Sequence, residues 1–167
     1  MMISDLSEEK KKILSQSNVW NKACPVSLYR LQSGIVSYVD FNGKVHTDGE
    51  IVVLDAAAKR VAFIFKHLFE AGFPVEKVIC LSHYAGDDKL SMEDNNSSAF
   101  NCRDIPDQSA LSIHSYGLAI DINPCQNPFL EIDDEKGTVS VQPWTGTGFL
   151  NRRNQKPGMV EEIVPLF

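Results

Sequence analysis

The sequence predicts a single α+β domain built on an antiparallel sheet with flanking helices. Three observations favour this class: an alternating strand pair around Asn42-Gly43, an amphipathic helix over residues 56–71, and strand-like segments at 50–54 and 75–81 on either side of that helix. With 167 residues and 43% hydrophobic composition, the chain can bury one core but is short for two. We expect residues 1–19 to form an N-terminal helical extension and residues 20–167 to form the core domain.

The N-terminal third predicts a short surface helix followed by a β-hairpin. Residues 5–16 open with an Asp-x-x-Glu helix-start pattern and continue into a lysine-rich stretch. Residues 35–41 (IVSYVDF) alternate and lead into Asn42-Gly43, a strong hairpin signal, with KVHT as the return strand.

The middle of the chain predicts the main core helix between two strands. EIVVL at 50–54 is apolar and β-branched, and VEKVICL at 75–81 reads as a second strand. Between them, Asp55 is a predicted N-cap and Gly72 a helix end. The apolar residues of this helix recur at helical spacing: Val61, Ile64, Phe65, Leu68 and Phe69.

The C-terminal half predicts a polar site-lining segment, one more strand and a turn. Residues 82–111 are polar and too long for a simple connection, so we expect them to line a site. A short strand is predicted over 118–123, where apolar and small or polar residues alternate. A turn is predicted around Asp133 to Gly137.

Charge and composition exclude several functional classes. The 22 acidic residues outnumber the 16 basic ones, and a net charge of -6 disfavours a nucleic-acid partner held through phosphates. Apolar runs are only a few residues long, so no membrane span is expected, and the start MMISDLSEEKKK lacks the apolar core of a signal peptide.

The four cysteines show no CxxC spacing and are too few for a disulfide-dense scaffold. We expect free buried thiols, with a single bridge in an exported form as the alternative; the four are Cys24, Cys80, Cys102 and Cys125.

The stretch SIHSYGLAIDINP contains a histidine and an aspartate that are seven positions apart. On one helix His114 and Asp121 would lie about 10 Å apart along the axis, and on one strand they would face opposite sides. They converge only if the chain bends between them, as Gly117 allows. We therefore expect His114 in the loop before the strand, Asp121 on its cleft-facing side, and ligand atoms within about 4 Å of each other.

Imidazole nitrogen and carboxylate oxygen are ordinary zinc ligands, and catalytic zinc sites use three protein ligands plus water. Spacing alone favours the simpler interpretation, a hydrogen-bonded His–Asp pair. The hypothesis of a metal site therefore needs evidence from residues other than this pair.

The spacing Ser-x-His-x-x-Gly-x-Ala-x-Asp resembles the signature of the D-alanyl-D-alanine carboxypeptidase family of zinc metallopeptidases. The five positions are Ser112, His114, Gly117, Ala119 and Asp121. The family includes VanY-type carboxypeptidases and L-alanyl-D-glutamate endopeptidases, and the resemblance covers residues 20–165. It implies an α+β, hedgehog/DD-peptidase-like fold, zinc as cofactor, peptidoglycan stem peptides as substrate, and a periplasmic or cell-wall location, with the cytoplasm as the alternative.

The resemblance also implies roles for individual residues. His114 and Asp121 correspond to zinc ligands, and Arg103 is the candidate for binding a substrate carboxylate. A structural ion pair of Arg103 with Asp104 or Asp107 is the alternative. Ser112 either binds the substrate or caps the loop.

This chain departs from the family pattern at its C-terminal end. In the family, an acidic general base precedes the third zinc-binding histidine by three positions, whereas here no histidine follows His114 and the chain ends in EEIVPLF. We leave the general base unassigned, expect it beyond residue 167, and give that role to neither Glu161 nor Glu162. His67 is expected to be a packing or surface residue rather than a ligand, which leaves His83 as an outside substitute ligand.

The expected function is therefore a zinc peptidase acting on stem peptides that is weak or inactive in this 167-residue form. Two alternatives remain: a non-catalytic family member that binds cell-wall peptide, and a cysteine peptidase using Cys102 and His114. The residues do not distinguish D-Ala-D-Ala, D-Ala-D-lactate and L-Ala-D-Glu bonds.

Overall fold

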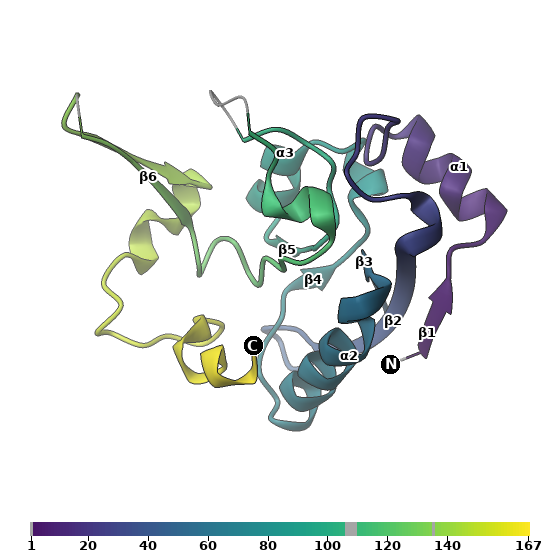
Figure 1. Cartoon of the computed structure of the whole chain (residues 1–167). Helices are drawn as coiled ribbons and strands as arrows, with labels where there is room; N and C mark the ends of the chain where they lie inside the picture. The colour runs from purple at the N-terminus through teal and green to yellow at the C-terminus, as the bar shows by residue number, and fades with distance from the viewer. Residues whose placement is uncertain (1, 106–109, 135) are drawn as a thin grey trace.

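The computed structural model describes residues 2–105, 110–134 and 136–167. It confirms an α+β fold with antiparallel sheets. The central sheet has the order β1-β2-β3 and is antiparallel throughout, formed by β1 (Met2–Asp5), β2 (Leu31–Val39) and β3 (Val45–Leu54). Figure 1 shows this sheet beside the long helix α2 (Asp55–Glu70).

The predicted hairpin is confirmed, but its second strand is longer than expected. Val45–Thr47 of the expected return strand and EIVVL belong to one continuous strand, β3. This strand pairs with β2, with a bulge between Val36 and Tyr38. Gly43 has φ +79° in the turn, the left-handed conformation that favours glycine.

Helix α2 packs its apolar stripe on one face of the sheet. Four of the five predicted positions are buried, and Phe69 is half-buried. The predicted N-cap is wrong: Leu54 occupies that position, and the Asp55 carboxylate accepts hydrogen bonds from Arg30 at 2.6 and 2.9 Å instead. His67 Nδ1 donates to Phe63 O at 2.8 Å and its ring contacts the Phe63 ring, in line with the packing role expected for it.

The N-terminal segment begins as a strand rather than a helix. β1 pairs with β2, and α1 (Glu8–Gln16) starts only after Ser7, whose Oγ accepts from Lys10 N at 3.1 Å. Leu6 and Leu14 are buried in a second apolar cluster on the other side of the sheet, with Val52 and Phe100. The boundary at residue 19 stays a prediction.

The strand predicted over 75–81 is mostly wrong. Only β4 (Lys77–Val78) is extended, and it pairs in parallel with β5 (Asn96–Ser97), while a 3₁₀ helix follows at Leu81–Tyr84. The polar segment between 82 and 111 contains α3 (Asp88–Glu93) and β5 within its described part.

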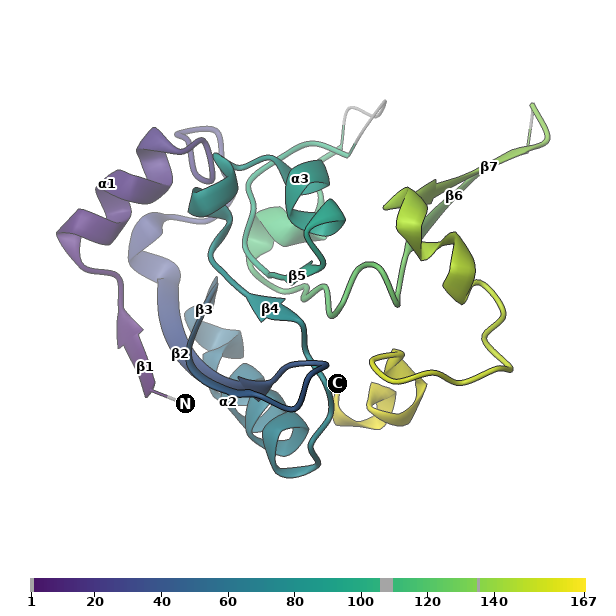
Figure 2. The ribbon, with the colours of Figure 1, turned by 180° about the vertical axis from the view of Figure 1, so that it is seen from behind.

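The turn around Asp133 to Gly137 joins β6 (Phe129–Asp133) and β7 (Thr138–Gln142), an antiparallel pair. Figures 1 and 2 both show this hairpin extending away from the body formed by the central sheet and α2. Short 3₁₀ helices follow the hairpin, at Trp144–Phe149, Val160–Glu162 and Val164–Leu166. In the described ranges, no helix has the length and apolar character needed to cross a membrane.

The expectation of four free thiols is wrong for two of them. Cys24 and Cys102 form a disulfide that closes a separation of 78 residues, whereas Cys80 and Cys125 are free. The alternative of a single bridge is therefore the one observed.

Candidate active site

The site is assembled along the outer edge of β3. β2 occupies the inner edge, and the outer edge is bonded by segments from elsewhere in the chain: Phe100 N donates to Val52 O at 3.0 Å, and Leu54 N donates to Gly117 O at 3.1 Å. The segments carrying the predicted site residues are thus fixed to the sheet by backbone hydrogen bonds.

Gly117 makes the bend that brings His114 and Asp121 together. It has φ +66° and ends the 3₁₀ helix Ile113–Tyr116, which contains His114. A Cβ atom at this position would lie 2.7 Å from Leu54 N, so the close contact with β3 also requires glycine.

The strand predicted over 118–123 is reduced to one bridge. Asp121 and Ser98 exchange backbone hydrogen bonds at 2.8 and 3.0 Å, and His114 lies in a helical turn rather than in a loop. Leu118 is exposed, whereas Ile120 and Ile122 contact the apolar cluster that includes α2, so only two of the three residues expected on the core face reach the core. The buried Asn123 fixes the segment beyond Asp121, since its side chain bonds Glu76 N and Pro74 O.

The predicted convergence of His114 and Asp121 is confirmed. His114 Nε2 lies 3.3 Å from Asp121 Oδ2, and His114 Nδ1 lies 2.6 Å from Ala99 O. A carbonyl oxygen only accepts, so Nδ1 carries a hydrogen and Nε2 is the nitrogen that faces the carboxylate. An unprotonated Nε2 and a carboxylate are both acceptors, so a proton or a cation is needed between them.

These two side chains fit a zinc ion. Ligands about 2 Å from a tetrahedral ion are about 3.3 Å apart, and metal-binding histidines commonly donate their other ring N–H to a backbone carbonyl. Both features are present here. Within the described ranges, however, no group of three or more His, Cys, Asp or Glu side chains is arranged to hold a metal ion.

The environment of His114 favours its charged form. Burial lowers the pKa of His114, but the hydrogen bond and charge of Asp121, the Ala99 carbonyl and the charge of Asp88 outweigh it and leave the pKa above 6.5. The pair is therefore in a negative field, the kind of field that also attracts a cation.

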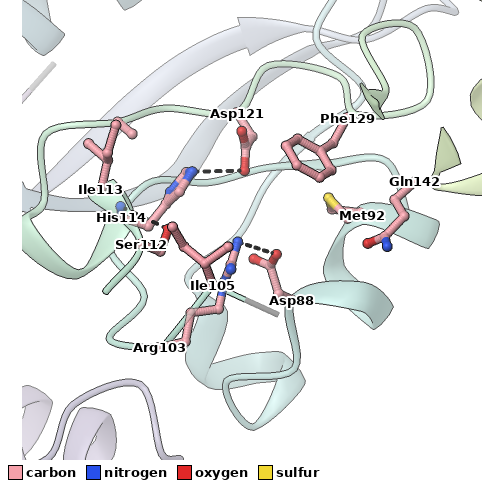
Figure 3. Close-up of a pocket in the computed structure, with 11 residues that line it drawn as sticks. Asp88, Met92, Arg103, Ile105, Ser112, Ile113, His114, Asp121, Phe129 and Gln142 are labelled. Atoms are coloured by element: carbon pink, nitrogen blue, oxygen red, sulfur yellow. Dashed lines mark hydrogen bonds and ion pairs between the residues drawn. The ribbon is translucent and has the colours of Figure 1, made fainter. Parts of the chain in front are cut away.

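A cavity of about 370 Å³ opens beside the pair. Figure 3 shows His114 and Asp121 on one side, a second charged pair of Arg103 and Asp88 below, and Phe129 and Met92 on the far side. Further lining residues include Ile105, Ser112, Ile113, Ala119 and Gln142.

Arg103 faces this cavity as predicted, but its ionic partner was not foreseen. Its Nη2 lies 2.6 Å from Asp88 Oδ2, and with Asp104 it makes only a long 3.4 Å contact to the backbone carbonyl. Asp107, the other expected partner, lies outside the described residues.

Ser112 is buried and lines the cavity. Its Oγ accepts from His114 N at 3.3 Å, so it caps the 3₁₀ helix, which is one of its two expected roles. The two roles are compatible because Oγ keeps its own hydrogen to donate.

The remaining candidates lie elsewhere. His83 is exposed in the 3₁₀ helix Leu81–Tyr84 and does not line the cavity. Glu161 forms an ion pair with Arg152, which lowers the pKa of Glu161, and Glu162 lines a different cavity beside α2. Cys102 is in the disulfide, so it has no thiolate for the cysteine-peptidase alternative, which is wrong.

Six lining residues were not singled out from the sequence: Asp88, Met92, Ile105, Ile113, Phe129 and Gln142. The first three lie in the polar segment 82–111, which was expected to line a site as a whole. A signal existed for the first two, because Asp87 precedes a helical turn and residues four apart share a helix face. Phe129 and Gln142 are direct cross-strand partners at the base of the β6–β7 hairpin, which a precise strand register would have revealed.

The C-terminal part of the chain, which carries most of this site, matches a known protein family. Residues 106–167 match a family model described as D-alanyl-D-alanine carboxypeptidase, and over this range the match agrees with the resemblance predicted from the sequence. The matched range includes Ser112, His114 and Asp121. It supports a hydrolase, specifically a peptidase of the D-alanyl-D-alanine carboxypeptidase type. No curated protein and no solved structure matches the chain.

Proposed function

We propose that this protein is a zinc-dependent peptidase acting on peptidoglycan stem peptides, with His114 and Asp121 as the metal ligands. The observation that supports this most is the 3.3 Å approach of His114 Nε2 to Asp121 Oδ2 inside a cavity that also contains a guanidinium. When bound, zinc supplies Lewis-acid polarisation of a peptide carbonyl and activation of water.

The chain's own residues supply binding and orientation. Arg103 binds the terminal carboxylate of the peptide, to which a guanidinium fork is well matched. Ser112 donates its hydroxyl hydrogen to the peptide while its Oγ continues to cap the helical turn. Phe129 and Met92 form an apolar wall that suits small side chains such as that of alanine.

We propose that the 167-residue chain holds zinc weakly and turns over slowly. The described residues offer two adjacent ligands, and zinc affinity and water activation both depend on a fuller ligand set. The presence of two rather than three adjacent ligands among the described residues also favours a second candidate function. In this case the protein would bind cell-wall peptide through Arg103 without cleaving it.

The disulfide supports an oxidising location for this function. Cys24–Cys102 joins two segments of the core, and such bonds persist mainly in extracellular or periplasmic compartments. A periplasmic or cell-wall protein would meet peptidoglycan directly.

The first test is the zinc stoichiometry of the dialysed protein, measured by elemental analysis. We expect wild-type protein to take up zinc, and His114→Ala and Asp121→Asn to lose about tenfold or more in affinity. His67→Ala serves as the matched control, because His67 lies on α2 against Phe63. Unchanged zinc binding in both site variants would contradict the assignment.

Release of D-alanine from a stem pentapeptide separates the two candidate functions. Slow, zinc-dependent release supports the peptidase. Binding of the peptide without release supports the non-catalytic protein. A His83→Ala variant belongs in the same series, since loss of zinc there would identify His83 as a ligand despite its exposed position.

A further inference from the structure

Asp88 and Arg103 form a largely enclosed ion pair in the wall of the cavity. Arg103 Nη2 lies 2.6 Å from Asp88 Oδ2, and the side chains of Arg103 and Asp88 are only 27% and 17% exposed, respectively. They come from different elements, α3 and the segment after β5, and Figure 3 shows the pair directed into the same space as His114 and Asp121. The ion pair forms only while α3 and the segment after β5 keep their relative positions.

The backbone of Arg103 is fixed independently of its side chain. Arg103 N donates to Ser115 Oγ at 3.0 Å, and Arg103 O accepts from Ser115 Oγ at 2.9 Å and from Ser112 N at 3.0 Å. The backbone position from which the Arg103 side chain extends is therefore fixed by the same helical turn that contains His114.

The guanidinium itself has few other partners. In the described part of the chain, Asp88 is the only carboxylate paired with it. Nη1 makes a 3.4 Å contact with Asp104 O, and the buried Nε has no hydrogen-bond partner among the described residues. Without Asp88, little in the described part of the chain would determine where the guanidinium of Arg103 lies.

Asp88 is itself well placed to hold it. It lies in the first turn of α3, whose N-cap is the neighbouring Asp87, with Oδ1 accepting from Leu90 N at 3.0 Å. The other end of α3 is fixed by Asp94, which accepts from Tyr84 Oη at 2.6 Å. The carboxylate of Asp88 thus stands on an element anchored at both ends.

We propose that Asp88 is a positioning residue that holds the Arg103 guanidinium ready to bind the terminal carboxylate of a peptide, a role that rests on the proposed function. A guanidinium has five N–H donors, so it can keep Asp88 on one side and bind a second carboxylate on another. Because an unrestrained arginine side chain loses conformational entropy when it is ordered, orientation by Asp88 removes part of this cost from substrate binding.

The test compares two peptides on zinc-loaded protein by titration calorimetry: a stem pentapeptide with a free C-terminal carboxylate and the same peptide ending in a carboxamide. The ratio of the two affinities measures recognition of the carboxylate alone. Asp88→Asn is the test variant because it keeps the shape and removes the charge. Asp87→Asn is the matched control, since asparagine is an equally good N-cap and Asp87 is exposed. Arg103→Ala gives the ratio in the absence of the guanidinium.

We expect wild type and Asp87→Asn to prefer the carboxylate, and Asp88→Asn to lose about fivefold or more of that preference with its zinc content unchanged. An unchanged preference in Asp88→Asn overturns the role of Asp88 while leaving the proposed function intact. An increased preference overturns it too, because Asp88 would then compete with the substrate. A wild type with no preference, equal to Arg103→Ala, overturns the proposed substrate class and this role together.

Discussion

Gly117 meets two structural requirements at one position. Its φ of +66° is costly for other residues, by about 1–2 kcal/mol, and a side chain there would also contact the backbone of β3. The carbonyl of Gly117 in turn accepts from Leu54 N, which attaches the site to the sheet.

A Gly117→Ala substitution should therefore destabilise the protein more than its conformation alone explains. Gly72 is a matched control, because its φ is +64° and a Cβ there would contact nothing within 4 Å. We expect Gly72→Ala to lower the free energy of unfolding by about 1 kcal/mol and Gly117→Ala by about 3 kcal/mol, measured by urea denaturation. Equal losses would mean that the contact with β3 relaxes at no cost.

At the residue scale, the sequence predicted the His114–Asp121 pair with Arg103 and Ser112 beside it, but it did not predict the partner of Arg103. The seven-residue spacing with a central glycine correctly brought His114 and Asp121 together. Asp88 escaped notice because its partner Arg103 is 15 positions away, and only the folded arrangement of α3 and the cavity segment joins them. Local sequence patterns indicate which residues are neighbours within one helix or strand. The Asp88–Arg103 ion pair depends instead on how two separate elements are placed relative to each other.

At the scale of elements, α3 is held in place by a small polar network at its C-terminal end. Asp94, its C-cap residue, accepts from Tyr84 Oη and pairs with Lys77 of β4. Hydrogen bonds from Lys77 and then Tyr84 lower the pKa of Asp94, and burial opposes them only partly. Burial, and then the hydrogen bond to the Asp94 carboxylate, raise the pKa of Tyr84.

This network should stabilise the protein in a pH-dependent way. A carboxyl group whose pKa is lower in the folded state stabilises the fold above its unfolded pKa, about 3.9, and this contribution disappears as the pH falls through the lower folded value. We expect Asp94→Asn to have a lower urea midpoint than wild type at pH 7, and the difference to close in strong acid.

Glu93→Gln provides the control for this series, because Glu93 adjoins Asp94 and its ion pair among the described residues is a long 3.9 Å contact with Lys89. Its midpoint should follow that of wild type at each pH. A gap between Asp94→Asn and wild type that stays constant down to about pH 2, below the unfolded pKa, would show that the carboxylate's charge is irrelevant.

The elements that were predicted well are those with strong local signals. The hairpin with Asn42-Gly43 and the amphipathic stripe of α2 needed no long-range information. The predicted strands at 75–81 and 118–123 were wrong over most of their length, because their apolar residues pack against the sheet and α2 without forming long ladders themselves.

At the scale of the whole molecule, one covalent bond joins distant parts of the core. Cys24–Cys102 links the segment after α1 to the residue before Arg103, and Cys102 N also donates to Val19 O at 3.0 Å. Both cysteines belong to or pack against the apolar cluster around Leu14, Val52 and Phe100.

Removal of this disulfide should destabilise the entire fold. By the loop-entropy model, a bridge that closes 78 residues contributes about 4 kcal/mol. We expect the Cys24→Ser/Cys102→Ser variant to have a clearly lower melting temperature than wild type. Reduction of wild-type protein should produce a similar decrease.

Cys125→Ser is the appropriate control, since Cys125 is free and its Sγ lies 3.2 Å from Thr145 Oγ1, a contact that a hydroxyl can reproduce. Its melting temperature should stay close to that of wild type. A reductant that leaves the melting temperature of wild type unchanged would contradict a stabilising role for the bridge.

The outer edge of β3 has a consequence for solubility. An open strand edge is a template for pairing with another molecule, and here the residues around Phe100 and Gly117 occupy it. The segments that present His114 and Asp121 therefore also block intermolecular strand addition. Substitutions that detach these segments would expose the edge of a β-branched strand. Inactive variants of this kind should therefore self-associate. Selection that maintains the site would also prevent fibre-like assembly.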